Sequence, residues 1–400
     1  MSQIHVLVIN CGSSSVKFSI IDSNSGQAVL TGIAERLLSA KASFKLSYQQ
    51  QSEQLSLKAP YDHQAAITEL VQQLTRLALL DTLSAVGHRV VHGGEHFSAP
   101  SLITKEVKQT IADLAHLAPL HNPANLTGIN AAEKALGHLP QVAVFDTAFH
   151  QSMPEKAYLY GLPYELYQEH DIRRYGFHGS SHSFVAGQAA NFIGKPLRQC
   201  SFISAHLGNG CSITAIKAGQ SIDSSMGFTP LEGVMMGSRS GDLDPGIIFH
   251  LIEHLGYSPE QVQTLLNKDS GLLGLSGLSN DCRELEQAAL TQGNKRAKLA
   301  LEIFCYRIAK YIAALSASLT SLDGVIFTGG IGENSSYVRE QVINQLSLLN
   351  FHLDQDKNRE TRFGKSDDIS TPSSRYALVI PTNEEGVIAS QSIQVLQEVL

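Results

Sequence analysis

Residues 4–21, IHVLVINCGSSSVKFSII, decide the fold. Two short β-rich runs, 4–9 and 16–21, flank the polar segment Asn10–Ser15. Short β-rich runs on either side of a turn made of small polar residues predict a strand, a tight turn and a second strand. The stretch therefore predicts a β-hairpin with glycine and serine at its tip.

The same order returns about half a chain length later. Apolar runs within 202–216 flank His206–Gly210, and Gly26-Gln27 after the first hairpin corresponds to Gly219-Gln220 after the second. Two matching strand–turn–strand units at this separation indicate an internal duplication.

Helical patterns lie between these units. Residues 63–80, 105–115 and 296–318 carry apolar residues at the i, i+3, i+4 spacing of an amphipathic helix. Further strands are predicted at 142–145, 324–327 and 377–380. Strands that alternate with helices are typical of an α/β fold and not of an all-β fold.

Composition excludes several classes of protein. The 400 residues suit about two or three domains, and 30 Lys+Arg against 37 Asp+Glu give a net charge of −7, without the basic block that a nucleic-acid partner requires. No window approaches the roughly 18 uninterrupted apolar residues of a membrane span. Five scattered cysteines without a C-x-x-C pair favour reduced thiols over disulfides or a zinc site. No secretory signal is visible, so we expect a cytoplasmic protein.

Three glycine-rich turns are candidate phosphate sites, because backbone N–H groups free of side-chain bulk form an anion-binding concavity. In the first turn, Ser13–Ser15 add hydroxyl donors, Lys17 adds a charge, and Asn10 can reach a phosphate or its metal. The second turn is Gly208–Gly210, and an ordinary hairpin is the alternative for both. The third, Thr328–Asn334, follows a predicted strand and precedes a predicted helix, a common place for a nucleotide.

The familiar nucleotide motifs fail on inspection. Phe363–Ser366 looks like the end of a P-loop, but Arg359 occupies the position of the first required glycine. Gly330-x-Gly332 opens a dinucleotide fingerprint whose third glycine is replaced by Ser335. The chain is therefore expected to be neither a Walker-type NTPase nor a Rossmann dehydrogenase.

Longer stretches closely resemble the motifs of the acetate kinases, the acetokinase family. The resemblance covers essentially the whole chain, with Ser238 where the family pattern has threonine, a conservative difference. It is carried by Val8–Lys17, Val86–Gly94, Ala118–Pro123, Phe145–His150, Arg174–Gly179, His206–Gly210, Met236–Pro245, Gly329–Asn334 and Thr382–Glu385.

The resemblance implies two duplicated actin-like (ribonuclease H-like) α/β domains with a nucleotide cleft between them. We expect an N-terminal domain of residues 1–148 plus 384–400 and a C-terminal nucleotide-binding domain of residues 149–383. The implied activity is reversible, Mg²⁺-dependent, in-line transfer of the ATP γ-phosphoryl group to acetate by a homodimer. The alternatives are a propionate or other short-chain acyl kinase, a sugar kinase of the same fold, and a non-catalytic nucleotide-dependent scaffold.

The resemblance also assigns catalytic roles. Arg89 and Arg239 match the two active-site arginines, whose planar forks bind carboxylate or phosphate bidentately, although a structural ion pair is the commoner role of an arginine. His178 matches the histidine that stabilises the transition state, and Asp146 matches the active-site carboxylate. Acetate is already ionised at pH 7, so we expect Asp146 to orient an arginine or a metal-bound water and not to remove a proton.

The remaining assignments concern ligands. Asn10 and Glu384 match the Mg²⁺ positions, with the adjacent Glu385 as the alternative, and oxygen ligands suit this hard cation. Residues matched to ATP are Lys17, His206, Leu207, Gly208, Asn209, Gly210, Asp281, Cys282, Arg283, Gly329, Gly330, Ile331, Gly332 and Glu333.

Val91 lies two residues after Arg89, on the same face if the chain is extended there. With Leu120, Phe177 and Pro230, it is expected to form a small apolar pocket for the methyl group of acetate. The alternative is that Val91 only fills the core.

Overall fold

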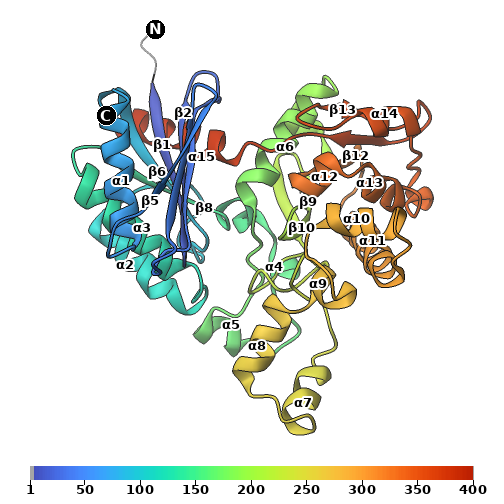
Figure 1. The fold of residues 1–400 in the computed structure, drawn as a ribbon. Helices are drawn as coiled ribbons and strands as arrows, with labels where there is room; N and C mark the ends of the chain where they lie inside the picture. The colour runs from blue at the N-terminus through green and yellow to red at the C-terminus, as the bar shows by residue number, and fades with distance from the viewer. Residues whose placement is uncertain (1–3, 400) are drawn as a thin grey trace. The chain divides into compact units, whose positions relative to one another are not determined.

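The structure is a computed structural model that describes residues 4–399. Residue contacts divide the chain after Gln151 and after Thr382, near the boundaries expected at 148 and 384. Unit 1 contains the residues up to Gln151 and those from Asn383 onward, and unit 2 is Ser152–Thr382. Each unit is an α/β structure with its own sheet (Figure 1).

Unit 1 has an eight-stranded sheet in the order β5-β4-β3-β2-β1-β6-β8-β7. Strands β1 to β5 form an antiparallel series, and β1, β6 and β8 are parallel. The strands are β1 His5–Gly12, β2 Ser15–Asp22, β3 Ala28–Glu35, β4 Ser43–Tyr48, β5 Gln51–Ser56, β6 Leu83–Val90, β7 Ser101–Leu102 and β8 Gln141–Phe145. The α-helices are α1 His63–Arg76, α2 Lys105–Asp113, α3 Asn122–Leu136 and α15 Glu384–Val399, with 3-10 turns at Leu80–Thr82, Leu114–His116 and Ala148–Ser152.

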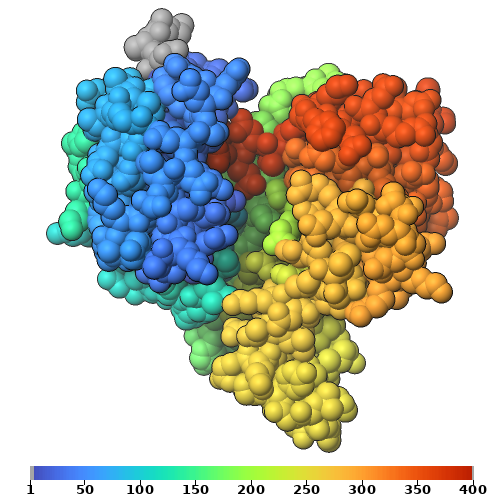
Figure 2. Space-filling model, in the orientation of Figure 1, coloured from blue at the N-terminus to red at the C-terminus, as the bar shows by residue number. Residues whose placement is uncertain are grey.

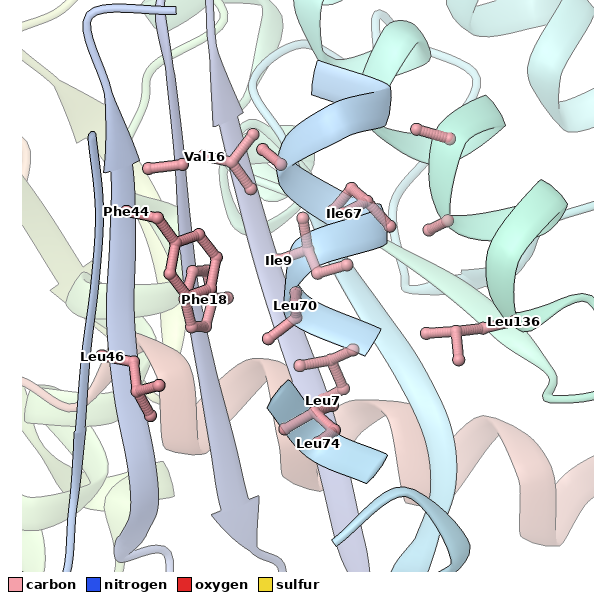
Figure 3. Packing of buried hydrophobic residues seen from close by; sticks show 14 of the residues in the cluster. Leu7, Ile9, Val16, Phe18, Phe44, Leu46, Ile67, Leu70, Leu74 and Leu136 are labelled. Atoms are coloured by element: carbon pink, nitrogen blue, oxygen red, sulfur yellow. The ribbon is translucent and has the colours of Figure 1, made fainter. Parts of the chain in front are cut away.

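Helices cover both faces of this sheet. On one face, Leu7 and Ile9 of β1 pack in the same cluster as Ile67 and Leu70 of α1, as Figure 3 shows. On the other face, alternate β1 residues such as Val8 pack with the apolar side of α15. Because successive strand residues point to opposite faces, a strand covered on both sides needs an unbroken apolar run, and Val6–Ile9 is such a run.

Unit 2 has a six-stranded sheet in the order β11-β10-β9-β12-β14-β13. The strands are β9 Ser201–Leu207, β10 Cys211–Lys217, β11 Gln220–Ser224, β12 Gly324–Thr328, β13 Asp367–Asp368 and β14 Tyr376–Val379. The longer helices are α6 Gly179–Phe192, α7 Gly246–Glu253, α8 Pro259–Lys268, α10 Cys282–Leu290, α11 Lys295–Ser316 and α13 Ser336–Ile343. Short helices are α4 Glu155–Tyr158, α5 Glu165–His170, α9 Gly271–Ser276, α12 Gly329–Asn334 and α14 Gln355–Glu360, with 3-10 turns at Leu197–Gln199 and Ser347–Leu349.

The two sheets repeat the same design. In unit 1 the order β3-β2-β1-β6-β8 runs through two antiparallel and then two parallel pairings, and β11-β10-β9-β12-β14 does the same in unit 2. Gly26 and Gly219 occupy equivalent turns, each with positive φ, before β3 and β11. The predicted α/β class and its duplication are confirmed.

One predicted turn is a helix instead. We expected 328–334 to be a glycine-rich loop before a helix, but Gly329–Asn334 is itself the short helix α12. Gly329 has φ +75°, and a Cβ there would lie 2.7 Å from the Leu207 carbonyl oxygen, so only glycine fits. The chain can therefore turn directly from β12 into a helix against β9.

Two further observations concern the chain's surroundings. All five cysteines are buried and free. Among residues 4–399, no helix combines the length and apolar character needed to cross a bilayer.

Within unit 2, the segment with α7 and α8 projects from the rest (Figure 2, yellow) and exposes Ile247, Phe249 and Leu255.

Candidate active site

In unit 1, three predicted site residues lie at one edge of the sheet. Asn10 is near the carboxyl end of β1, Arg89 near that of β6, and Asp146 directly follows β8. The register pairs Ile9 with His88, and the Asp146 N–H donates to the Val90 carbonyl at 3.0 Å. The carboxyl ends of neighbouring parallel strands are the usual ligand-binding edge of such a sheet.

Arg89 and Asp146 form a two-point ion pair at this edge. Arg89 Nε donates to Asp146 Oδ1 at 2.9 Å, and Nη2 donates to Oδ2 at 2.6 Å. The Asp146 charge raises the pKa of Arg89 further above its ordinary value, against the cost of burial. The pair fixes the plane of the guanidinium and directs its remaining donors away from Asp146.

Glu384 is the first residue of α15, and its charge also helps to raise the pKa of Arg89. It is half-buried, whereas Glu385 is exposed. Among the described residues no group of three or more His, Cys, Asp or Glu side chains could hold a metal ion. Asn10 and Glu384, the predicted Mg²⁺ ligands, each carry a side-chain oxygen, the ligand type of this ion, which keeps waters and substrate oxygens in most of its coordination positions.

Val91 directly follows strand β6, which ends at Val90, so the shared face of Arg89 and Val91 stays a prediction. The Val91 N–H donates to Asn125 Oδ1 at 3.1 Å, and its side chain is buried. Leu120 is 54% exposed within this unit.

In unit 2, the side chains of His178 and Arg239 both lie close to Gly210 of the second glycine turn. A Cβ added at Gly210 would be 3.5 Å from the His178 ring and 3.6 Å from Arg239 Nη1. His178 has φ +57°, caps the start of α6 and stacks on His206 with ring centroids 4.3 Å apart. Its Nδ1 is 2.9 Å from the Ser212 hydroxyl, which leaves Nε2 turned toward Gly210.

Arg239 has no carboxylate within ion-pair distance in the part of the chain that the structure describes. Its Nη1 donates to the Pro230 carbonyl oxygen at 3.2 Å. Burial lowers the pKa of Arg239 from its ordinary value, because the guanidinium lacks a compensating charge. A desolvated cation without a counter-ion is a ready binding group for an anionic ligand. Phe177 and Pro230, also assigned to substrate, belong to this unit, and Phe177 is buried.

Unit 2 also contains a pocket of about 610 Å³. From the predicted ATP residues it takes Gly208, Asn209, Asp281, Cys282, Arg283, Gly330 and Ile331. It adds six residues that we did not predict, namely Asn280, Glu286, Asn334, Ser335, Arg362 and Phe363. Of these six, Asn334 ends the predicted glycine-rich turn 328–334, and Phe363 begins the P-loop-like segment that we had set aside.

Other predicted ATP residues are not among those that line this pocket. Gly329 and Gly332 are buried in α12, and Leu207 is buried in β9. The Glu333 carboxylate accepts hydrogen bonds from the N–H groups of Gly329 and Thr382, both at 3.0 Å, so it stabilises the turn from inside. Lys17 is exposed on β2 of unit 1.

Asp281 and Arg283 form one polar wall of the pocket. Asp281 caps α10 by accepting from the Arg283 N–H at 2.8 Å, and its carboxylate also accepts from the Arg283 side chain. The hydrogen bonds from Arg283 lower the pKa of Asp281 below its ordinary value, so it is an anion with acceptor capacity at the surface. Burial raises the pKa of the Cys282 thiol, so it stays protonated.

Comparisons with known proteins show similarity over nearly the whole chain. Residues 5–390 match the model of the acetokinase family. An acetate kinase of Shewanella sp. (strain ANA-3) is 53% identical over 398 residues, which are 99% of this chain and 100% of the relative. Two solved structures are each 43% identical with a TM-score of 0.93. One is an acetate kinase from Porphyromonas gingivalis, covering 98% of this chain and 99% of its own. The other is a propionate kinase from Francisella tularensis, covering 99% and 100%.

Proposed function

The chain belongs to the acetokinase family, and from this we propose that it transfers the γ-phosphoryl group of ATP reversibly to acetate, giving acetyl phosphate and ADP. The observation that carries the proposal is Arg239, a half-buried cation beside His178 and a glycine turn, with no carboxylate partner among the described residues. Phosphoryl transfer asks little covalent chemistry of a protein, and mainly needs positioning and neutralised charge.

The chief obstacle is that an anion must attack an anion. Acetate is a carboxylate at neutral pH and needs no general base. We assign Arg239 to the charge that spreads over the oxygens of the transferring group, and His178 Nε2 to a hydrogen bond with the same group. Arg89, held by Asp146, binds and orients the carboxylate.

The pocket of unit 2 is proposed to take the nucleotide. Gly208–Gly210 lie at the phosphate end, and Lys17 contributes a further charge to the phosphates. His206 and Leu207 support the turn from β9, and the Asp281–Arg283 wall binds the ribose hydroxyls. Gly330 and Ile331 face the base, while Gly329, Gly332 and Glu333 form the supporting layer behind them.

We propose Asn10 and Glu384 as the protein ligands of Mg²⁺. When bound, the ion offsets phosphate charge and orients the leaving group. Two observations support Glu384 over Glu385 as the ligand. Glu384 is half-buried, and its charge helps to raise the pKa of Arg89.

The acyl pocket decides between acetate and a longer acid. We retain Val91, Leu120, Phe177 and Pro230 as its lining, on the resemblance and not on a shared strand face. Because a propionate kinase is 43% identical to this chain, propionate is the second candidate acceptor.

The assembly and the cell compartment stay predictions. A homodimer would cover the exposed apolar residues of the projecting α7 segment. Cytoplasmic localisation follows from the five free thiols.

A panel of acceptors tests the proposed function. Initial rates of ADP release are measured with acetate, propionate, butyrate and glucose at saturating Mg-ATP, each as kcat/KM. We expect acetate to give the highest value and glucose none above background. A higher value for propionate would make the chain a propionate kinase, and ADP release independent of any acid would remove it from the acyl kinases.

A further inference from the structure

Phe363 has two energetically unfavourable features, an exposed aromatic ring and a left-handed backbone conformation. It is 83% exposed, and its backbone has φ +56°, a conformation that residues with a Cβ seldom adopt. It belongs to the P-loop-like segment Phe363–Ser366 and yet lines the nucleotide pocket. An exposed ring and a left-handed backbone both cost free energy, so their combination beside a pocket points to a ligand.

Hydrogen bonds connect Phe363 to helix α12, another segment of the pocket lining. The Phe363 N–H donates to Asn334 Oδ1 at 2.9 Å, and Asn334 Nδ2 donates to the Gly330 carbonyl oxygen at 3.0 Å. Asn334 and Gly330 belong to α12, which lies far from residue 363 in sequence. One amide side chain thus sets the distance between Phe363 and the α12 side of the pocket.

The buried side chain of Arg339 forms hydrogen bonds with both α12 and the segment that precedes Phe363. Arg339 is fully buried and donates to the carbonyl oxygens of Gly332 at 2.9 Å and Glu333 at 2.8 Å in α12. Its other nitrogens bond the Asn358 side chain and carbonyl and the Thr361 carbonyl, two residues before Phe363. Burial, and next the charge of Arg362, lower the pKa of Arg339 to about 10. This network makes the wall rigid before any nucleotide arrives.

Arg362 backs the exposed ring. Its guanidinium carbon lies 5.1 Å from the centroid of Phe363, a cation–π distance, and its Nε is buried without a hydrogen-bond partner. Arg362 therefore covers one face of the ring, and the other face is left to solvent. A flat, open π-face at the edge of a pocket of about 610 Å³ matches a planar base.

We propose that Phe363, backed by Arg362, is a stacking wall for the purine base of the bound nucleotide. The proposal rests on the proposed function and extends it to a segment that matches no nucleotide motif. Stacking acts on the base alone, so Phe363 contributes to nucleotide affinity and leaves the transfer step to Arg239 and His178.

The test uses two substitutions at residue 363 and a matched control. Phe363→Gly removes the ring and suits φ +56° better than phenylalanine, so the fold is not weakened. Phe363→Tyr keeps the ring. Leu348→Ala removes a 99% exposed apolar side chain elsewhere in unit 2. Calorimetric titration with ADP gives Kd, and steady-state kinetics give kcat at saturating ATP and KM for acetate.

We expect Phe363→Gly to weaken ADP binding on the order of 10-fold, the loss measured for one base–aromatic stack. Phe363→Tyr should stay within about twofold of the wild type. Leu348→Ala should change neither Kd nor kcat nor KM for acetate. An unchanged Kd in Phe363→Gly would overturn the proposal, as would an equal loss in Phe363→Tyr or a parallel fall in kcat. A wild type that binds ADP but releases none with acetate would instead refute the proposed function.

Discussion

Replacing Arg239 by alanine tests the assignment on which the transfer chemistry depends. The substitution removes a cation that Gly210 and His178 adjoin and no carboxylate neutralises within the described residues. A unit charge about 4 Å from a charged oxygen is worth about 4 kcal/mol at an effective dielectric constant near 20. Only the part that grows in the transition state affects kcat, so we expect a loss on the order of 10²–10³, as for one preorganised electrostatic donor.

The structural cost of the same change is small. Arg239 makes one hydrogen bond to a carbonyl, that of Pro230, so unfolding should become easier by only about 1 kcal/mol. Thermal denaturation should therefore shift by a few degrees while kcat collapses. Arg239→Lys keeps the charge without the planar fork, and should recover part of the rate.

The assay is steady-state ADP release with acetate and Mg-ATP varied in turn, with exposed Arg198→Ala as the matched control. We expect kcat to fall far more than KM for ATP rises. An unchanged kcat together with a lower melting temperature would show that Arg239 is structural, and the charge argument would be refuted.

Three further predictions follow from the structure. Glu384→Gln should raise the Mg²⁺ concentration for half-maximal activity on the order of 10-fold, while Glu385→Gln should not; the reverse order in a magnesium titration would move the ligand by one residue. Val91→Ala should raise kcat/KM for propionate relative to acetate about 10-fold, and an unchanged ratio in a stable variant would remove Val91 from the acyl pocket. Burial lowers the pKa of His88 from 6.5 to about 4, so the unfolded chain binds a proton there that the folded chain excludes. The contribution of His88 to the free energy of unfolding is constant above pH 6.5. It should decline by at most about 3 kcal/mol as the pH falls to 4. Urea unfolding at pH 7 and pH 5 should show a smaller difference in His88→Gln, and an equal difference would place the titration elsewhere.

The local part of the fold could be predicted because it is written in short patterns. The β-rich runs 4–9 and 16–21 predict two strands around a turn, and the second strand–turn–strand unit predicts the repeat, because a hairpin is determined by neighbours in sequence. Strand β5, Gln51–Ser56, could not be predicted in the same way. Its residues are polar and almost all exposed, so only pairing with β4 makes it a strand.

The same distinction between local and long-range information applies to the residues of the candidate site. Residues inside contiguous motifs, such as Arg89 and Arg239, could be assigned from the sequence by resemblance. Arg362 and Phe363 could not, because the pocket they line is built from segments near 209, 281 and 331 that meet only in the folded chain. For Val91, the predicted shared face with Arg89 depends on the backbone at the point where β6 ends, which the sequence pattern does not mark.

We propose above all that a carboxylate oxygen of acetate attacks the γ-phosphoryl group of ATP. Isotope labelling tests this directly. The protein is incubated with Mg-ATP and acetate carrying ¹⁸O in both carboxylate positions, and the products are followed by ³¹P NMR. The account predicts acetyl phosphate and ADP in equal amounts, with ¹⁸O in the bridge between carbon and phosphorus. ADP accompanied by inorganic phosphate alone, or acetyl phosphate with ¹⁶O in the bridge, would contradict it.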